Sequence, residues 1–406
     1  MNVRTSVTAF ACAIALASCI GVVGCSSTSQ SASSSSAAAE SSATSQASST
    51  AASTPHVEAT IACKHNEDSG WVELITDSAS FLEFGFEIGD SIDLEFSNGY
   101  KLEGVPLYTD SYVREYEPVA VAHKDSDAVV LKFNAGDDLW TVAGLQNEAS
   151  PQVTITLRER GTYLDTEYSR KLTYTNNIAN YGSETVFANF RAISGGKLRS
   201  NWIYRSASPI DNQNKRASYA CDLAEEAGVK FFLNLSDNDD KIKEHCEASD
   251  FDSQYYADLF NAGNVKAVAM NFAAREQQFG EKVVAGLVAM SEHEGPYLIH
   301  CVEGKDRTGF VCILLEMLAG ASLDEIRADY MLSYANYFGV TAQSRPGVYN
   351  GIVTLAFDPL VEVVTGAEPK ADLSTYDLPA CAEKYLLDHG MTEDQLAKLK
   401  SAILNE

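Results

Sequence analysis

Residues 297–309 read YLIHCVEGKDRTG, and this stretch decides how the second half of the chain folds. The apolar run from Tyr297 to Ile299 follows a Gly-Pro pair, which is typical of a buried strand. The run from Phe310 to Leu318 consists of good helix formers and stops at Gly320, which predicts a helix. The pattern Cys-x5-Arg lies between them, so we expect a thiol at the mouth of a helix N-terminus.

This placement predicts a site for a phosphoryl group. A helix start offers unpaired N–H groups and partial positive charge, and both favour an anion. The same field lowers the pKa of a thiol, so we expect Cys301 to be nucleophilic, with Lys305 and Arg307 adding to the effect. Five intervening residues let the loop direct its amides at phosphoryl oxygens, and the planar Arg307 can clamp two of them. We expect Thr308 to hydrogen-bond the sulfur and Gly304 to relieve steric limits where the backbone turns.

The run HCVEGKDRTG at 300–309 resembles the signature loop of cysteine-dependent protein tyrosine phosphatases. Its ending is similar to the bacterial tyrosine/serine branch, whose members often also act on phosphoinositides. Further matching stretches lie at 189–191, 204–207 and 385–399, so the resemblance spans residues 185–406. The resemblance implies that Cys301 is the nucleophile, that Arg307 holds the phosphoryl oxygens, and that the substrate phosphate is bound by His300, Val302, Glu303, Gly304, Lys305 and Thr308.

Three residues of this loop keep more than one interpretation. His300 either orients the loop and favours the thiolate or is a packed, hydrogen-bonded core histidine. Lys305 either holds a second anionic group, such as another phosphate on an inositol ring, or is a solvent-facing charge beside the pocket. Asp306 either binds a hydroxyl of the leaving group, serves as general acid, or only pairs with Lys305.

The general acid has two candidates in this sequence. Cleavage of a phosphate ester requires a proton on the departing oxygen, which a carboxylic acid usually provides. The related branch often carries Asp-Leu-Arg where this chain has Asn234, Leu235 and Ser236. The nearest carboxylate is then Asp237, which we predict to follow the strand beside the catalytic one and to act as the acid, with Asp306 as the other candidate. The competing interpretation of Asp237 is an acidic loop that caps the next helix.

From residue 185 onward the pattern alternates between strand and helix. We predict strands at 201–205, 229–235 and 297–299, and helices at 215–227, 279–291, 310–318 and from Asp324 onward, with Ser322 as its cap. A capping box is predicted at Thr392 and Gln395. This order implies an α/β fold with a tyrosine-phosphatase-like central sheet flanked by helices. Ligands of such sheets bind at the carboxyl ends of strands, where Cys301 falls.

Residues 57–180 have a different character. β-rich runs at 71–75, 91–96, 128–133 and 152–157 are separated by turn signals containing Gly and Asp. Short strands at this spacing predict a smaller N-terminal β-barrel or β-sandwich domain, which we interpret as a spacer or binding module.

The N-terminus has the pattern of a processing segment. Arg4 precedes an apolar run from Val7 to Val23, and residues 22–25 resemble the lipobox of bacterial lipoproteins. We therefore expect a signal peptide at 1–24 and lipid attachment at Cys25; the alternative is an uncleaved membrane anchor. Residues 25–56 are almost wholly small and polar, which predicts a flexible tether. Both interpretations place the globular part outside the cytoplasm and attached to a membrane.

The net charge and the cysteine spacing exclude some classes of partner and of structural site. The formal net charge of −26 argues against nucleic acid, which would be repelled. Six cysteines follow Cys25, with the spacing of neither a disulfide scaffold nor a zinc site. We expect Cys312 to be a packing residue, and the sequence leaves open whether Cys221 and Cys246 form a disulfide.

The sequence thus predicts a membrane-anchored, extracytoplasmic phosphatase that hydrolyses phosphate monoesters through a cysteinyl-phosphate, without metal or cofactor. Phosphotyrosine in proteins is the expected substrate. A phosphoinositide or another phosphorylated polyol is the alternative, motivated by Lys305. A binding module that captures a phosphorylated ligand without turnover is a further alternative, motivated by the departure at 234–236.

Overall fold

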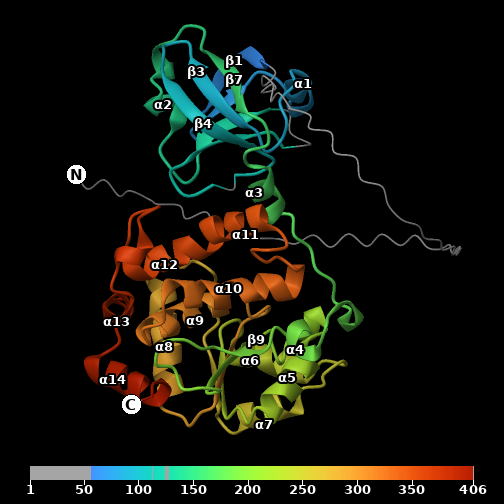
Figure 1. Cartoon of the computed structure of the whole chain (residues 1–406), viewed down its shortest axis with the longest axis vertical. Coiled ribbons are helices and arrows are strands. Elements are labelled where there is room, and N and C mark those ends of the chain that lie inside the picture. Colours follow the sequence, from blue (N-terminus) through green and yellow to red (C-terminus); the bar gives the residue numbers. More distant parts are fainter. Residues whose placement is uncertain (1–55, 112, 124–127, 406) are drawn as a thin grey trace, which may run out of the picture. The chain divides into compact units, whose positions relative to one another are not determined.

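The computed structural model describes residues 56–111, 113–123 and 128–405, which form a closed barrel and a separate sheet with helices on both faces (Figure 1). The predicted signal peptide, the lipidation residue Cys25 and the tether up to residue 55 lie outside the described residues.

The N-terminal sheet is a closed seven-stranded barrel with the order β1-β2-β6-β5-β4-β3-β7. Neighbouring strands are antiparallel except β4 and β5, which are parallel. Buried and exposed residues alternate along β1, so that Ala59, Ile61 and Cys63 face the barrel interior. Of the two architectures predicted for this region, the structure has the barrel. Its strands are β1 (Glu58–Asn66), β2 (Trp71–Leu74), β3 (Ser91–Phe96), β4 (Lys101–Tyr108), β5 (Pro118–Val121), β6 (Val130–Phe133) and β7 (Gln152–Glu159).

The second sheet has five strands in the order β11-β10-β12-β9-β8, and all neighbours are parallel except β8 and β9. In the register of the central strands, Asn234 pairs with His300 and His300 pairs with Ser206. The loops that follow these three strands therefore meet at one edge of the sheet. The strands are β8 (Arg191–Ala192), β9 (Ile203–Ser206), β10 (Phe231–Asn234), β11 (Val265–Ala267) and β12 (Tyr297–His300).

Helices cover both faces of this sheet, as predicted. Phe231 and Leu233 of β10 belong to one apolar core, which includes side chains of α8 (Gln277–Ser291) and α9 (Asp306–Leu318). Phe232 of the same strand belongs to another core, with side chains of α5 (Ala217–Glu226), α6 (Asp239–Cys246) and α7 (Gln254–Asn261). Because β10 and β12 are buried on both faces, residues 231–233 and 297–299 read as continuous apolar runs in the sequence.

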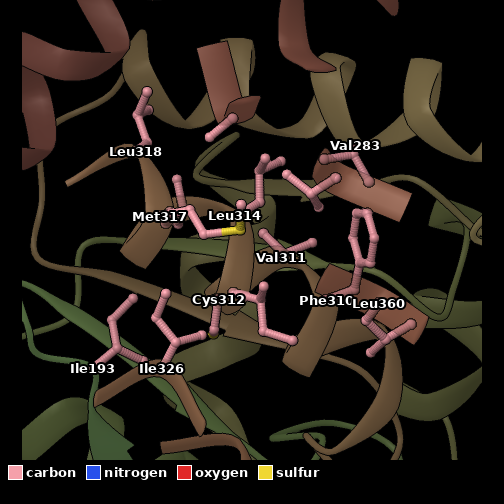
Figure 2. Packing of buried hydrophobic residues seen from close by; sticks show 14 of the residues in the cluster. Ile193, Val283, Phe310, Val311, Cys312, Leu314, Met317, Leu318, Ile326 and Leu360 are labelled. Carbon is pink, nitrogen blue, oxygen red and sulfur yellow. The ribbon is translucent and has the colours of Figure 1, made fainter. Parts of the chain in front are cut away.

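Helix α9 is enclosed on all sides, since every residue from Thr308 to Leu318 is buried. Figure 2 shows side chains of α9, among them Val311 and Leu314, in one cluster with Val283 of α8 and Leu360 of α12. This packing fixes the helix whose N-terminus forms the candidate site. The other helices of this region are α4 (Glu184–Phe187), α10 (Leu323–Phe338), α11 (Pro346–Ile352), α12 (Asp358–Thr365), α13 (Leu378–Asp388) and α14 (Glu393–Ile403).

Three helix starts differ from the sequence prediction by two residues or more. The helix expected from residue 279 begins at Gln277. The helix expected from residue 215 begins at Ala217, because Lys215 adopts a left-handed conformation with φ 59° that ends the preceding turn. The helix expected from residue 310 begins at Asp306, since the apolar run marks only its buried part and the first turn is polar. The caps predicted for α10 and α14 are confirmed, and both are capping boxes.

Candidate active site

The predicted phosphate loop connects β12 to α9 at the carboxyl edge of the sheet. Cys301 directly follows β12, and Lys305 is the N-cap residue of α9, without a side-chain cap hydrogen bond. Arg307 and Thr308 lie in the first turn of the helix. The strand, the loop and the helix start thus have the order expected from the sequence.

Four consecutive carbonyl oxygens of this loop, those of residues 302–305, are held by the surrounding protein. The backbone N–H of Ser208 donates to the oxygen of residue 302 at 3.0 Å. Asn189 Nδ2 donates to the oxygens of residues 303 and 304, each at 3.2 Å, and Tyr337 donates to that of residue 303 at 2.7 Å. Arg205 Nη2 donates to the oxygens of residues 304 and 305 at 2.8 and 3.3 Å.

The backbone N–H groups of the loop differ from its carbonyl oxygens. Within the described residues, the backbone N–H groups of 302–307 donate to no protein acceptor. The C=O of one residue and the N–H of the next belong to one trans peptide unit and point in opposite directions, so holding the carbonyls of 302–305 directs the amides of 303–306 away from the groups that hold them. A row of unpaired amides at a helix start is a site for an anion.

Gly304 is required at the turn of the loop. Its φ is +65°, and a Cβ built on it would lie 2.0 Å from the carbonyl oxygen of Ser206. Only glycine fits both the left-handed backbone and this close approach, as the sequence predicted.

A buried ionic cluster supports the loop from β8, β9 and α10. Arg205 is fully buried and pairs with Asp329 at 2.5 Å, and Arg191 pairs with the same carboxylate at 2.8 Å. Burial alone would raise the pKa of Asp329, but the two guanidinium groups lower it. The structural role expected for both arginines is confirmed, and through Arg205 the cluster reaches the backbone of Gly304.

Cys301 is 3% exposed and is a free thiol. Thr308 is fully buried, and its Oγ1 has no partner among the described residues, so it remains available for the sulfur. Cys221 and Cys246 are also free thiols, so the disulfide that the sequence left open is not formed. Cys312 is a packing residue, as expected, and burial raises its pKa to about 12.

Arg307 contacts the loop that follows β11. Its Nη1 donates to the carbonyl oxygen of Met270 at 3.0 Å. In the part of the chain that is described, its other N–H groups donate to no acceptor, so they are available for phosphoryl oxygens.

Asp237 lies in the loop that follows β10, and β10 is the strand beside β12, which leads to Cys301. Asp237 is 8% exposed. Asn234 Nδ2 donates to its carboxylate at 3.0 Å, and His245 Nε2 lies 3.8 Å from it. The loop that contains Asp237 does cap helix α6, as the competing interpretation expected, but the cap residue is Asn238 and the acidic residues of the first turn are Asp239 and Asp240. The loop of Met270 also holds Asp237, because Ala269 donates its backbone N–H to the Asp237 carbonyl at 3.0 Å.

The contacts of Asn234 explain why this chain has asparagine where the related branch often has the aspartate of Asp-Leu-Arg. Its Oδ1 accepts from the backbone N–H groups of Ser236 and Asp237, at 2.9 and 3.0 Å, and forms a turn. Its Nδ2 donates to Asp237 and to the hydroxyl of Tyr256. An aspartate could accept in the turn but would supply neither donor.

Lys305, Glu303 and Asp306 form a charged cluster at the start of α9. Lys305 Nζ lies 3.2 Å from Glu303 and 3.8 Å from Asp306, and its side chain is only 15% exposed. The interpretation of Lys305 as a solvent-facing charge is therefore wrong. Burial would lower its pKa, but Asp306 and Glu303 raise it, so Lys305 is cationic. The hydroxyl of Tyr174 donates to Glu303 at 2.6 Å.

Asp306 pairs with Lys305, as one of its three interpretations required, and its side chain is 44% exposed. Its pKa is raised, with desolvation by the protein as the largest cause and Lys305 opposing it. Solvent moderates this effect, because the side chain is partly exposed.

His300 is a packed residue without a hydrogen bond. It is fully buried, its ring lies edge-on to that of Tyr256 at 5.7 Å, and neither ring nitrogen has a partner within the described ranges. Burial lowers its pKa to about 3, so the imidazole is neutral. The interpretation of His300 as a packed core residue is thus confirmed, whereas its ring forms none of the expected hydrogen bonds with the described residues.

Several residues of the site were not identified as functional in the sequence. Tyr174 and Tyr337, which contact Glu303, lie outside the signature run, and Met270 contributes only a backbone carbonyl. Asn189, which also contacts the loop, could have been found from the sequence, because it begins the stretch 189–191 that resembles the tyrosine phosphatase family. Among the described residues there is no group of three or more His, Cys, Asp or Glu side chains that could hold a metal ion.

Comparison with known proteins identifies the family of this chain. A candidate tyrosine-protein phosphatase of Cupriavidus necator is 36% identical over 81 residues, which are 20% of this chain and 29% of that protein. The core catalytic domain of the PP-IP phosphatase SIW14 from S. cerevisiae, in complex with citrate, aligns with 44% of this chain and 91% of its own at 20% identity. The TM-score of that alignment is 0.25. The family model for the tyrosine phosphatase family matches residues 186–405, and the chain therefore belongs to this family of phosphatases.

Proposed function

We propose that the protein hydrolyses phosphate monoesters, with phosphotyrosine in proteins as its substrate, through a cysteinyl-phosphate on Cys301. One observation carries this proposal: the amides of 302–307 are unpaired within the described chain, while the carbonyls of 302–305 are held by other groups. Fixed N–H groups that need no reorganisation stabilise the charge that develops on a phosphoryl group in transfer.

In the first step, the Cys301 sulfur attacks phosphorus and the bond from phosphorus to the leaving oxygen breaks. A carboxylic acid gives its proton to that oxygen. Arg307 and the loop amides hold the phosphoryl oxygens throughout. In the second step, water attacks the phosphorus, the bond from sulfur to phosphorus breaks, and the carboxylate accepts the proton of the water. Thr308 donates a hydrogen bond to the departing sulfur.

Of the two candidate acids, the surroundings favour Asp306. An acid must lie within reach of the leaving oxygen, and Asp306 is the first residue of α9, directly after the loop that would hold the phosphate. Its side chain is also 44% exposed at the start of α9, whereas Asp237 is 8% exposed and accepts a hydrogen bond from Asn234. Asp237 remains the second candidate.

The alternative functions receive less support. Lys305, the motivation for a phosphoinositide or another phosphorylated polyol, is already paired with Glu303 and Asp306. The binding-only alternative depended on the departure at 234–236, and Asn234 has a structural role there, because it holds the turn and contacts Asp237 and Tyr256.

We propose further that residues 57–180 are an accessory domain and that a lipid on Cys25 attaches the protein to the outer side of a bacterial membrane. The apolar run before Cys25 and the small polar residues after it support this location. Incorporation of labelled palmitate into the full-length protein tests it, and the Cys25→Ala variant should remain unlabelled.

The reaction is tested by phosphate release from a small aryl phosphate. Wild type should release phosphate, and Cys301→Ser should reduce the rate to background. Cys381→Ser is the matched control, because Cys381 is another free thiol, half-buried and far along the chain from the loop. Equal rates for wild type and Cys301→Ser would contradict the proposed nucleophile.

A further inference from the structure

The segment that connects the barrel to the second sheet contacts the phosphate loop. Residues 170–183 lie between α3 (Leu164–Ser169) and α4, and the region that matches the tyrosine phosphatase family begins after them, at residue 186. Within this connecting segment, the Tyr174 hydroxyl donates to Oε1 of Glu303 at 2.6 Å. A residue outside the matched region therefore holds a side chain of the loop that follows Cys301.

The connecting segment is anchored by the buried Arg216. This residue is 1% exposed, and it donates to the Thr175 carbonyl oxygen at 3.1 Å and to the Tyr181 hydroxyl at 3.0 Å. The ring of Tyr174 packs against that of Tyr337, with 4.9 Å between the ring centres. A held neighbour and a packed ring thus fix the place of the Tyr174 hydroxyl.

Glu303 divides its carboxylate between two partners. Its Oε1 accepts from Tyr174, whereas its Oε2 lies 3.2 Å from Nζ of Lys305. The same ammonium lies 3.8 Å from the Asp306 carboxylate. The side chains of Glu303 and Lys305 are 16% and 15% exposed, so solvent screens their pairing only weakly. We call Tyr174, Glu303, Lys305 and Asp306 the Tyr174 network.

The ammonium of Lys305 depends on the two carboxylates of this network. Among the described residues, its ion pairs are those with Glu303 and Asp306, and the rings of Tyr334 and Phe338 lie 5.3 and 5.4 Å from it. Without the charge of Glu303, Lys305 would pair with Asp306. An ammonium in close contact with a carboxyl group favours its ionised form.

An acid must keep its proton until the leaving oxygen takes it. The charged and titrating groups around the Asp306 carboxyl are Lys305, Glu303, Arg205, Arg307, Tyr330 and Tyr334. Both tyrosines are neutral, because burial raises their pKa. The three cations favour loss of the proton, and the negative charge of Glu303 opposes them.

We propose that Tyr174 is a positioning residue for the acid step of the phosphatase. By fixing Glu303, it holds Lys305 back from Asp306, and the Asp306 carboxyl is left free to protonate the leaving oxygen. The proposal rests on the proposed reaction, with Asp306 as its acid. In that step the proton passes from Asp306 to the leaving oxygen while the bond from phosphorus to that oxygen breaks. The catalytic unit then begins within the connecting segment, before the region that matches the family.

The test compares two substrates that differ in their leaving groups. An alkyl phosphate needs a proton on its leaving oxygen and an aryl phosphate needs little, so the alkyl-to-aryl ratio of kcat reports on the acid. Glu303→Gln, which removes the charge and keeps the shape, should lower this ratio about tenfold. Tyr174→Phe, which removes only the hydroxyl, should lower it about three- to tenfold. If either variant fails to fold, the other still gives the ratio.

The pH dependence gives a second readout. With the alkyl phosphate, kcat falls at high pH as the acid loses its proton. In Glu303→Gln this fall should begin about one pH unit lower than in wild type, because Lys305 then pairs with Asp306 and solvent limits the shift at this partly exposed carboxyl. Adding Tyr174→Phe to Glu303→Gln should change the ratio by less than about twofold, since the neutral side chain no longer holds Lys305.

Tyr181→Phe is the matched control. Tyr181 lies in the same connecting segment, but its hydroxyl bonds to Thr175 and Arg216 rather than to the loop. This variant loosens the anchor without touching the Tyr174 network, so it should keep the wild-type ratio.

The outcomes separate this proposal from the one on which it rests. If Tyr174→Phe loses as much activity with the aryl as with the alkyl phosphate, the residue only supports the fold and the proposal is overturned. An unchanged ratio in Glu303→Gln would overturn it as well. An Asp306→Asn variant with the wild-type ratio would overturn it too, and would leave Cys301 as the nucleophile. If wild type releases no phosphate from the aryl ester, the proposed reaction itself fails.

Discussion

The substitution Gly304→Ala tests whether the shape of the loop controls catalysis. The new Cβ would lie 2.0 Å from the Ser206 carbonyl oxygen, and tight contacts lie at 3.0–3.4 Å. The loop must therefore move by about 1 Å or more, and a displacement of that size costs on the order of 100-fold in rate. The left-handed backbone adds about 1 kcal/mol of instability for a residue with a Cβ.

Gly228→Ala is the matched control for this prediction. Gly228 has φ +67°, and a Cβ there would meet nothing within 4 Å, so this variant has the same backbone strain without the clash. Aryl phosphate turnover and thermal unfolding should be measured on both variants. Both should lose about 1 kcal/mol from the backbone, and Gly304→Ala alone should lose about 100-fold in kcat/KM. Turnover by Gly304→Ala within threefold of Gly228→Ala would refute the reasoning.

Three further predictions follow from the charged and titrating groups. With an alkyl phosphate, whose leaving oxygen needs a proton, Asp306→Asn should lower kcat by about 10²–10⁴-fold and Asp237→Asn by much less; the reverse order would make Asp237 the acid. Because His300 has a pKa of about 3 when folded and near 6.5 when unfolded, stability should fall as pH drops from 6.5 towards 3, by at most about 5 kcal/mol. Unfolding titrations should show a smaller fall for His300→Phe, and identical pH profiles would contradict the buried neutral ring. Arg205→Met should cost about 3–5 kcal/mol in the free energy of unfolding, because it removes one of the two partners of buried Asp329; a loss below about 1 kcal/mol in denaturant titration would count against the cluster.

The sequence predicted the parts of the site that are contiguous. The strand, the loop and the helix start lie within thirteen residues, so local signals sufficed for Cys301 and Arg307. The sequence also predicted the three central strands β9, β10 and β12 and the helices α5, α8, α9 and α10. The short edge strands β8 and β11 and the helices α6 and α7 were not predicted. Barrel strands β1, β4 and β5 were not predicted: β4 contains Gly104 and Pro106, and β5 begins with a proline.

The support around the loop could not be predicted, because it depends on contacts between distant segments. Tyr174 and Tyr337 are 163 positions apart in numbering, yet both reach Glu303. The sequence does not decide between the two interpretations of Lys305, because the pairing of Lys305 with Glu303 depends on how the loop turns. The role of Asn234 likewise became clear only from its partners in space, Asp237 and Tyr256.

The central claim is that the Cys301 sulfur accepts the phosphoryl group. Rapid quenching of the enzyme during turnover of an aryl phosphate, followed by mass spectrometry of its peptides, tests this claim most directly. The account predicts phosphate on the peptide that contains Cys301 in wild type and no such adduct in Cys301→Ser. Turnover with no phosphate on Cys301, or with the adduct on another residue, would contradict it.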